Sequence, residues 1–261
     1  MNLAILAAGF ATRLYPLTKD RPKPLLEIHG QALLTRLLFQ ALETGAIEEA
    51  AVVVNARFRV EFENWSASQE FPVEVVVNKA QEANQAPGAI ADLRLLLDKG
   101  FRSSSPRPWI VLAGDNLLDF SLSDVVSMHA ENLQQPLFLV RKIEGPIPPN
   151  RYSEVRFDSQ GYINQIREKP DDPSSPYSAI GVYLLPPDLP ELLSIYLDLG
   201  GDADALGHLM SWLAQKRACR VWHIPSGFWW DIGNLESYQQ ATQASLKNLR
   251  AKGPKNLPAK R

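Results

Sequence analysis

Short apolar runs alternate with segments of helical period through the first half of the chain, and this alternation limits the possible folds most. Leucine and alanine recur at helical spacing over 33–42, and Gly45 follows as a helix stop. Two more helices are expected around 57–65 and after Pro87. The apolar runs have the length of strands and cover 3–7, 50–54, 73–77 and 109–113. Apolar strands separated by helices indicate a parallel sheet covered on both faces. We therefore predict an α/β fold with a doubly wound, mostly parallel, Rossmann-like central sheet.

The second half has a different pattern, with shorter strands and turn residues between them. Ser159 to Gly161 is typical of a hairpin connection, and a proline-rich loop covers 145–150. Strands are expected over 136–141, 152–157, 162–167, 179–185 and 219–224, and helices over 189–197, 203–215 and 235–249. No linker separates the two halves. We predict a single domain over 1–249, with a first part to about 135, a smaller β-rich part over 136–249, and a flexible tail over 250–261.

Bulk composition excludes several classes of partner. The 261 residues carry a net charge of −2, which gives no basis for a general affinity for nucleic acid. No segment approaches the about 18 apolar residues of a membrane span. The apolar start MNLAILAAG lacks a basic region and is expected to form a buried strand instead of a signal peptide. Cys219 is the only cysteine, so an intrachain disulfide is impossible, and a reducing, cytoplasmic location is expected. No residue pattern indicates an oligomeric state.

The segment LAAGFATRLYPLTKDRPKPL, residues 6–25, follows the first predicted strand. Ligands of parallel sheets bind beyond the carboxyl ends of the strands. Small residues around Gly9 let backbone N–H groups approach a phosphate closely. Arg13 offers a forked donor for phosphate oxygens, and Lys23 a compact positive charge. The segment matches neither the P-loop nor the Rossmann fingerprint, and these features alone also fit an ordinary loop with two solvated cations.

The same segment resembles the opening motif of the sugar-1-phosphate nucleotidyltransferases, or nucleotide-sugar pyrophosphorylases, L-A-x-G-x-x-T-R-L-x-P-L-T followed by P-K-P-L. Many members have glycine where this chain has Ala8 and Ala11. The resemblance extends to about Tyr238, and glucose-1-phosphate thymidylyltransferases are the most similar group. It implies the nucleotide-diphospho-sugar transferase fold, with a nucleotide-binding first part and a sugar-binding second part. The motif is matched at Leu6, Ala7, Gly9, Thr12, Arg13, Leu14, Pro16, Leu17, Thr18, Pro22, Lys23, Pro24 and Leu25.

The resemblance also implies roles for single residues. Arg13 grips the triphosphate, and Lys23 neutralises the reacting phosphates. An amide can pair with a base edge, and Gln81 and Gln85 both precede Pro87 in the region where the family reads the base. Of the two we favour Gln81. The predicted nucleotide-binding residues are Leu6, Ala7, Ala8, Gly9, Thr12, Arg13, Gln81 and Gly88.

Two aspartates are the candidate metal ligands. Asp115 follows the apolar run 109–113, and Asp231 lies in the sequence Trp230-Asp231-Ile232-Gly233. Alone, each is typical of a turn stabilised by its own side chain. The family carries G-D and W-x-D-I-G at these relative places, and the resemblance implies that both aspartates bind Mg²⁺. Magnesium prefers oxygen ligands and keeps substrate phosphates and water in its shell.

A third set of residues resembles the family's sugar site. Glu168 and Lys169 match the family's E-K-P, where the glutamate binds sugar hydroxyls and the lysine contacts the sugar phosphate and joins Arg13 and Lys23 in catalysis. Tyr152 begins a stretch similar to the family's Y-G-x-V, in which Ser153 replaces the glycine. Ile180 replaces a polar residue in the family's x-G-I-Y pattern. The resemblance implies sugar binding by Tyr152, Glu168, Lys169 and Gly181.

We therefore expect Mg²⁺-dependent nucleotidyl transfer from a nucleoside triphosphate, with dTTP or UTP favoured, to a sugar 1-phosphate, which releases pyrophosphate. One alternative is a cytidylyltransferase that acts on phosphocholine or another phosphorylated acceptor. Another is a non-catalytic nucleotide-sugar-binding regulatory protein, since fold alone does not imply activity. A chain that had lost activity should have lost charges at the site. The enzyme reading is favoured because all of these charges are present: Arg13, Lys23, Asp115, Lys169 and Asp231.

Overall fold

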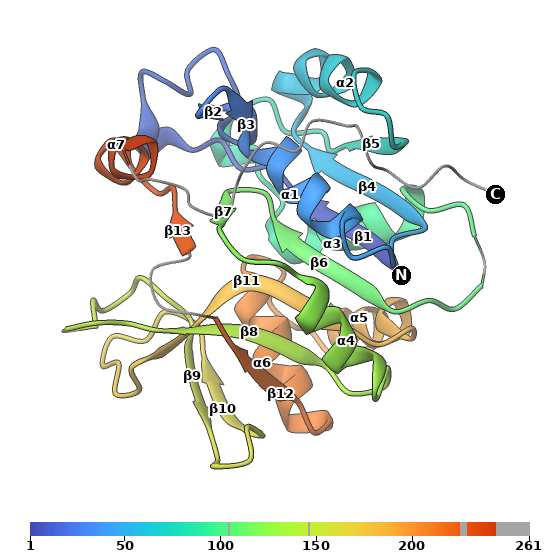
Figure 1. Cartoon of the computed structure of the whole chain (residues 1–261), viewed down its shortest axis with the longest axis vertical. Helices are drawn as coiled ribbons and strands as arrows, with labels where there is room; N and C mark the ends of the chain where they lie inside the picture. Colours follow the sequence, from blue (N-terminus) through green and yellow to red (C-terminus); the bar gives the residue numbers. More distant parts are fainter. Residues whose placement is uncertain (104, 146, 225–228, 244–261) are drawn as a thin grey trace.

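The computed structural model describes residues 1–103, 105–145, 147–224 and 229–243 (Figure 1). One nine-stranded sheet extends through both halves of the chain, and two separate two-stranded sheets flank it. The strands are β1 (Asn2–Leu6), β2 (Glu27–Ile28), β3 (Gln31–Ala32), β4 (Glu49–Val54), β5 (Val73–Val77), β6 (Trp109–Ala113), β7 (Asn116–Leu118), β8 (Leu137–Lys142), β9 (Glu154–Phe157), β10 (Ile163–Arg167), β11 (Tyr177–Leu185), β12 (Arg220–His223) and β13 (Trp229–Asp231). The α-helices are α1 (Leu33–Leu42), α2 (Arg59–Ala67), α3 (Ala89–Lys99), α4 (Ser123–Ala130), α5 (Leu189–Asp198), α6 (Leu206–Lys216) and α7 (Leu235–Gln243).

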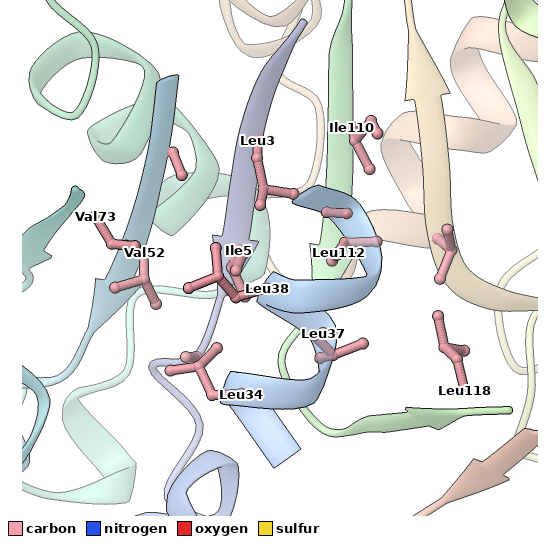
Figure 2. Packing of buried hydrophobic residues seen from close by; sticks show 14 of the residues in the cluster. Leu3, Ile5, Leu34, Leu37, Leu38, Val52, Val73, Ile110, Leu112 and Leu118 are labelled. Atoms are coloured by element: carbon pink, nitrogen blue, oxygen red, sulfur yellow. The ribbon is translucent and has the colours of Figure 1, made fainter. Parts of the chain in front are cut away.

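Four parallel strands in the order β5-β4-β1-β6 form the first part of the sheet. Ile5 on the central strand β1 lies opposite Val52 on β4 and Leu112 on β6. Figure 2 shows these side chains together with Leu34 and Leu38 of α1, which covers this face. The predicted apolar runs are therefore confirmed as neighbouring parallel strands.

Successive residues of β1 face opposite layers of helices. Leu3 belongs to the apolar cluster that includes α1 and Phe62 of α2, whereas Ala4 packs with Ile90 and Leu93 of α3 on the other face. Helices α5 and α6 contribute to the same cluster as α3. Both faces of the sheet are covered, which confirms the doubly wound α/β prediction.

The long strand β11 joins the two parts of the molecule. It runs antiparallel to β6 and also pairs with β8 and β9. The register with β8 shifts between Ala179 and Tyr183, where Gly181 has a φ of 73°. A glycine tolerates this left-handed conformation without a steric penalty. The register shift therefore includes Gly181, which was predicted from the sequence to bind the sugar.

Several elements differ from the sequence predictions. The helix expected over 203–215 begins at Leu206, because the carbonyls of Ala203 and Asp204 accept hydrogen bonds from the first amides of α3. The short strands β7 and β13 and helix α4 were not predicted. The helix expected over 235–249 is observed as α7 over Leu235–Gln243, and the predicted remainder over 244–249 and the tail over 250–261 lie outside the described residues. Among the described residues, no helix is both long and apolar enough to span a bilayer.

Candidate active site

A cleft of about 630 Å³ lies at the carboxyl ends of β1 and β6, between the two parts of the molecule. This volume is typical of small-molecule sites. Most of the residues predicted to bind substrates line it, although they come from segments far apart in the sequence. They are Leu6, Ala7, Ala8, Gly9, Arg13, Lys23, Gly88, Asp115, Tyr152, Glu168, Lys169, Gly181 and Asp231.

The loop after β1 is held in place by hydrogen bonds to its backbone. Asn55 Nδ2 donates to the carbonyl of Ala8 at 3.0 Å, and Thr18 Oγ1 donates to that of Ala11 at 2.8 Å. Ala11 adopts a left-handed conformation with a φ of 47°, which explains why the related motif favours glycine there. The following short 3-10 helix carries Arg13 to the cleft.

Lys23 is the cation most firmly placed in the cleft. Its side chain is 9% exposed, and Nζ lies 2.9 Å from Asp115 Oδ2. Burial disfavours the charged carboxylate of Asp115, but the charge and hydrogen bond of Lys23 outweigh this effect and lower the Asp115 pKa. Asp115 is therefore ionised at neutral pH.

Asp231 reaches the same place from the other end of the chain. Strand β13 pairs antiparallel with β7, so that Asp231 lies opposite Asn116, the residue after Asp115. Trp229 Nε1 donates to Asn116 Oδ1 at 2.7 Å, and Ile232 is fully buried against Leu14 and Leu117. Burial and the negative charge of Asp115 both raise the pKa of Asp231, and Lys23 opposes them in part.

The two carboxylates fit a divalent cation that also binds a phosphate. The charge of Asp115 raises the pKa of Asp231, and a cation between the two carboxylates would oppose this effect. The described residues contain no group of three or more His, Cys, Asp or Glu side chains that could enclose a metal alone. The remaining ligands would have to be phosphate oxygens and water, which is the usual shell of Mg²⁺.

Glu168 and Lys169, which were predicted to bind the sugar, both line the cleft. The Glu168 side chain is 8% exposed, and it accepts a hydrogen bond from Ser153 through Oε2. Lys169 Nζ lies 3.2 Å from Glu168 Oε1. Lys169 has a φ of 40°, a conformation that costs a non-glycine residue about 1 kcal/mol or more. Strained backbone of this kind often occurs at functional sites.

Three predicted nucleotide-binding residues have different surroundings. Gly88 lines the cleft with a φ of 98°, and a Cβ there would lie 2.7 Å from Asp204 Cα, so only glycine fits. Thr12 and Gln81 are exposed and are not among the residues that line the cleft. Gln81 instead donates its backbone N–H to Gln85 Oε1 at 2.9 Å. The binding roles of Thr12 and Gln81 stay predictions.

Sequence reasoning missed three charged residues of the cleft, Asp92, Arg151 and Asp204. Asp92 is 7% exposed and accepts a hydrogen bond from Asn78 Nδ2 at 2.7 Å. Burial raises its pKa, and the bond from Asn78 opposes the shift. Arg151 also lines the cleft, and its charge opposes the raised pKa of Asp231. The sequence could have identified Arg151 as a residue of the cleft, because it directly precedes Tyr152, which was predicted to bind the sugar. Asp92 falls on a helical pattern with no such signal.

The sequence model of a family described as nucleotidyl transferase matches residues 3–248. Mannose-1-phosphate guanylyltransferase catalytic subunit beta of Drosophila pseudoobscura pseudoobscura is 27% identical over 248 residues, which are 95% of this chain and 63% of the relative. The chain thus spans less than two thirds of that relative's length. UTP--glucose-1-phosphate uridylyltransferase AglF of Haloferax volcanii is 28% identical over 187 residues, 72% of each chain. The structure of a putative glucose-1-phosphate thymidylyltransferase from Bacillus anthracis has a TM-score of 0.79 at 21% identity, and the match covers 93% of this chain and 94% of that one.

Proposed function

The chain belongs to the nucleotidyl transferase family, and from this premise we propose that it transfers a nucleotidyl group from a nucleoside triphosphate to a sugar 1-phosphate. The products are a nucleotide sugar and pyrophosphate. The observation that carries the proposal is the pairing of β13 with β7, which brings Asp231 beside Asp115 in a cleft that also contains Arg13 and Lys23. Two carboxylates and two cations around one hollow suit a bound polyphosphate with its metal ion.

The reaction joins two anions, so its barrier depends on neutralising charge and on alignment. A phosphate oxygen of the sugar 1-phosphate attacks the α-phosphorus of the triphosphate, and the bond to the bridging oxygen breaks as pyrophosphate leaves. The attacking oxygen is already anionic at neutral pH, so no protein nucleophile is required. Arg13 and Lys23 would neutralise the triphosphate, and Lys169 would orient the acceptor phosphate.

Asp115 and Asp231 would hold the Mg²⁺ ion. When bound, Mg²⁺ screens phosphate charge and orients the phosphate oxygens. In this arrangement Lys23 also acts on Asp115. Its contact with Asp115 keeps that carboxylate ionised and fixed at the rim of the cleft.

The names of the relatives narrow the choice of substrates. The Drosophila relative is named as a guanylyltransferase for mannose 1-phosphate, and the Haloferax relative for UTP and glucose 1-phosphate. We therefore propose GTP with mannose 1-phosphate or UTP with glucose 1-phosphate as the first pairs to test. Of the two nucleotides favoured from the sequence, UTP agrees with the name of the Haloferax relative, whereas dTTP agrees with neither name.

Pyrophosphate release tests the proposal directly. Purified chain is incubated with GTP, UTP, dTTP, CTP or ATP against mannose 1-phosphate, glucose 1-phosphate and phosphocholine, with Mg²⁺ or with a chelator. We expect Mg²⁺-dependent release with at least one sugar 1-phosphate. Activity with CTP and phosphocholine alone would identify the alternative cytidylyltransferase. If no combination releases pyrophosphate and the chain binds a nucleotide sugar, the regulatory alternative would be favoured.

A further inference from the structure

A narrow recess at the sugar end of the cleft encloses the carboxylate of Glu168. The recess is bounded by the first turn of α6, where Gly207 is buried. A Cβ on Gly207 would overlap Glu168 Oε2 and would lie 3.0 Å from Ser153 Oγ. The absence of a side chain at position 207 therefore leaves the space that one oxygen of Glu168 occupies.

The two oxygens of Glu168 have different surroundings. Oε2 lies in the recess and accepts the hydroxyl hydrogen bond of Ser153, whereas Oε1 lies 3.2 Å from Lys169 Nζ. Ser153, Glu168 and Lys169 all line the cleft. Within the described residues, the Ser153 hydroxyl is the side-chain donor to Oε2. A buried carboxylate oxygen that loses its donor is costly. The carboxylate would then turn out of the recess.

We propose that Ser153 is a positioning residue for the acceptor sugar: its hydroxyl holds Glu168 Oε2 in the recess at Gly207, so that Oε1 faces the cleft to accept a sugar hydroxyl. The inference rests on the proposed function, because it assumes that Glu168 binds the sugar. It also gives a role to the serine that departs from the tyrosine–glycine–x–valine pattern. A glycine at position 153 could not supply this donor.

The test compares the Michaelis constants of the two substrates. Ser153→Ala removes the donor and is expected to raise KM for the sugar 1-phosphate about tenfold, given the strength of a hydrogen bond to a charged group. KM for the triphosphate should stay within twofold of wild type. Ser211→Ala is the matched control. Ser211 lies on α6, the helix that also carries Gly207, and it donates to the Ile166 carbonyl at 2.8 Å but does not line the cleft. This variant should leave both constants within twofold.

Two further variants separate the hydroxyl from side-chain volume. Ser153→Thr keeps the hydroxyl and should retain a sugar KM within about threefold of wild type. Gly207→Ala fills the recess and should raise the sugar KM as Ser153→Ala does. In the double variant, KM for the sugar 1-phosphate should rise by less than the product of the two single-variant fold-changes, since both substitutions act on one carboxylate. Thermal unfolding identifies any variant that fails to fold.

The outcomes for the inference and for the proposed function are distinct. An active wild type with a normal sugar KM in Ser153→Ala would overturn the inference alone. So would an equal rise in both Michaelis constants, which would indicate general damage to the cleft. If the wild-type chain releases no pyrophosphate with any substrate pair, the proposed function would be refuted, and the inference would be refuted with it.

Discussion

His129 offers a quantitative test of the structure that does not depend on the function. It lies in α4 with 2% of its surface exposed, and within the described residues neither ring nitrogen has a hydrogen-bond partner. It borders a cavity of about 30 Å³ that is also lined by Leu137 and Arg220. Burial lowers the pKa of His129 from 6.5 to about 4. The imidazole is therefore neutral in the folded protein throughout the mildly acidic range.

The sign of the resulting pH dependence follows from proton binding. Between pH 6.5 and 4 the unfolded chain binds a proton at His129 that the folded chain refuses, so the free energy of unfolding falls as the pH falls. The maximum slope is about 1.4 kcal/mol per pH unit. Integration gives a loss of about 2 kcal/mol at pH 5 and about 3 kcal/mol at pH 4. For a chain of this size, about 2 kcal/mol corresponds to a melting temperature lower by roughly 4–8 °C.

His129→Leu removes the titrating group and keeps an apolar side chain in the cavity wall. Urea unfolding at pH 7 should give a free energy of unfolding within about 1 kcal/mol of wild type. The substitution breaks no hydrogen bond, because the buried imidazole that it removes has no partner among the described residues. At pH 5 the variant should be more stable than wild type by about 2 kcal/mol. His208→Leu is the matched control, because the His208 side chain is 40% exposed and no buried imidazole is removed. Parallel pH profiles for wild type and His129→Leu would refute the reasoning.

Three further predictions concern the cleft. Asp115→Asn and Asp231→Asn should each lower turnover at least about 100-fold at saturating Mg²⁺ while the circular dichroism spectrum is unchanged, and near-normal rates in either variant would contradict the metal assignment. Lys169→Ala should raise KM for the sugar 1-phosphate far more than KM for the triphosphate, and equal losses would count against its contact with the acceptor. Gly181→Ala should lower the free energy of unfolding by about 2–3 kcal/mol, because its φ is 73° and the new Cβ would lie 2.9 Å from that of Ala113. Gly200→Ala has a similar φ of 79° with open space around it, so denaturation should show only about 1–2 kcal/mol of strain there.

The parallel part of the fold was readable because each of its strands is a continuous apolar run. Ala50 to Val54 is apolar throughout, and burial on both faces requires such a sequence. Strand β13 has no such signal: Trp229–Asp231 is three residues long, and its partner β7 lies more than a hundred residues earlier. Periodicity cannot reveal a pairing this short and this distant. The position of Asp231 beside Asp115 was reached only through the family motif.

Backbone conformations show the same limit. The left-handed φ of Ala11 and of Lys169 is imposed by the surrounding structure against local preference. Asp92 likewise looks like an ordinary polar helix residue, but it is buried and accepts a hydrogen bond from Asn78 of a different segment. Ala11, Asp92 and Lys169 all line the cleft, and departures from local preference are common at functional sites.

An apolar cluster next to the loop after β1 explains how the two ends of the chain can form one site. Leu14 from the loop packs with Leu117 beside Asp115 and with Ile232 beside Asp231. Each of these buried residues is adjacent or close in sequence to a charged residue of the cleft, so one cluster sets the relative positions of Arg13, Asp115 and Asp231. Tyr238 of α7 adds a hydrogen bond of 2.7 Å to the Glu27 carbonyl, which fastens the C-terminal segment to the region after the loop. Apolar packing thus keeps Asp231 near Asp115, although the charge of Asp115 raises the pKa of Asp231, and this is the place that we propose for Mg²⁺.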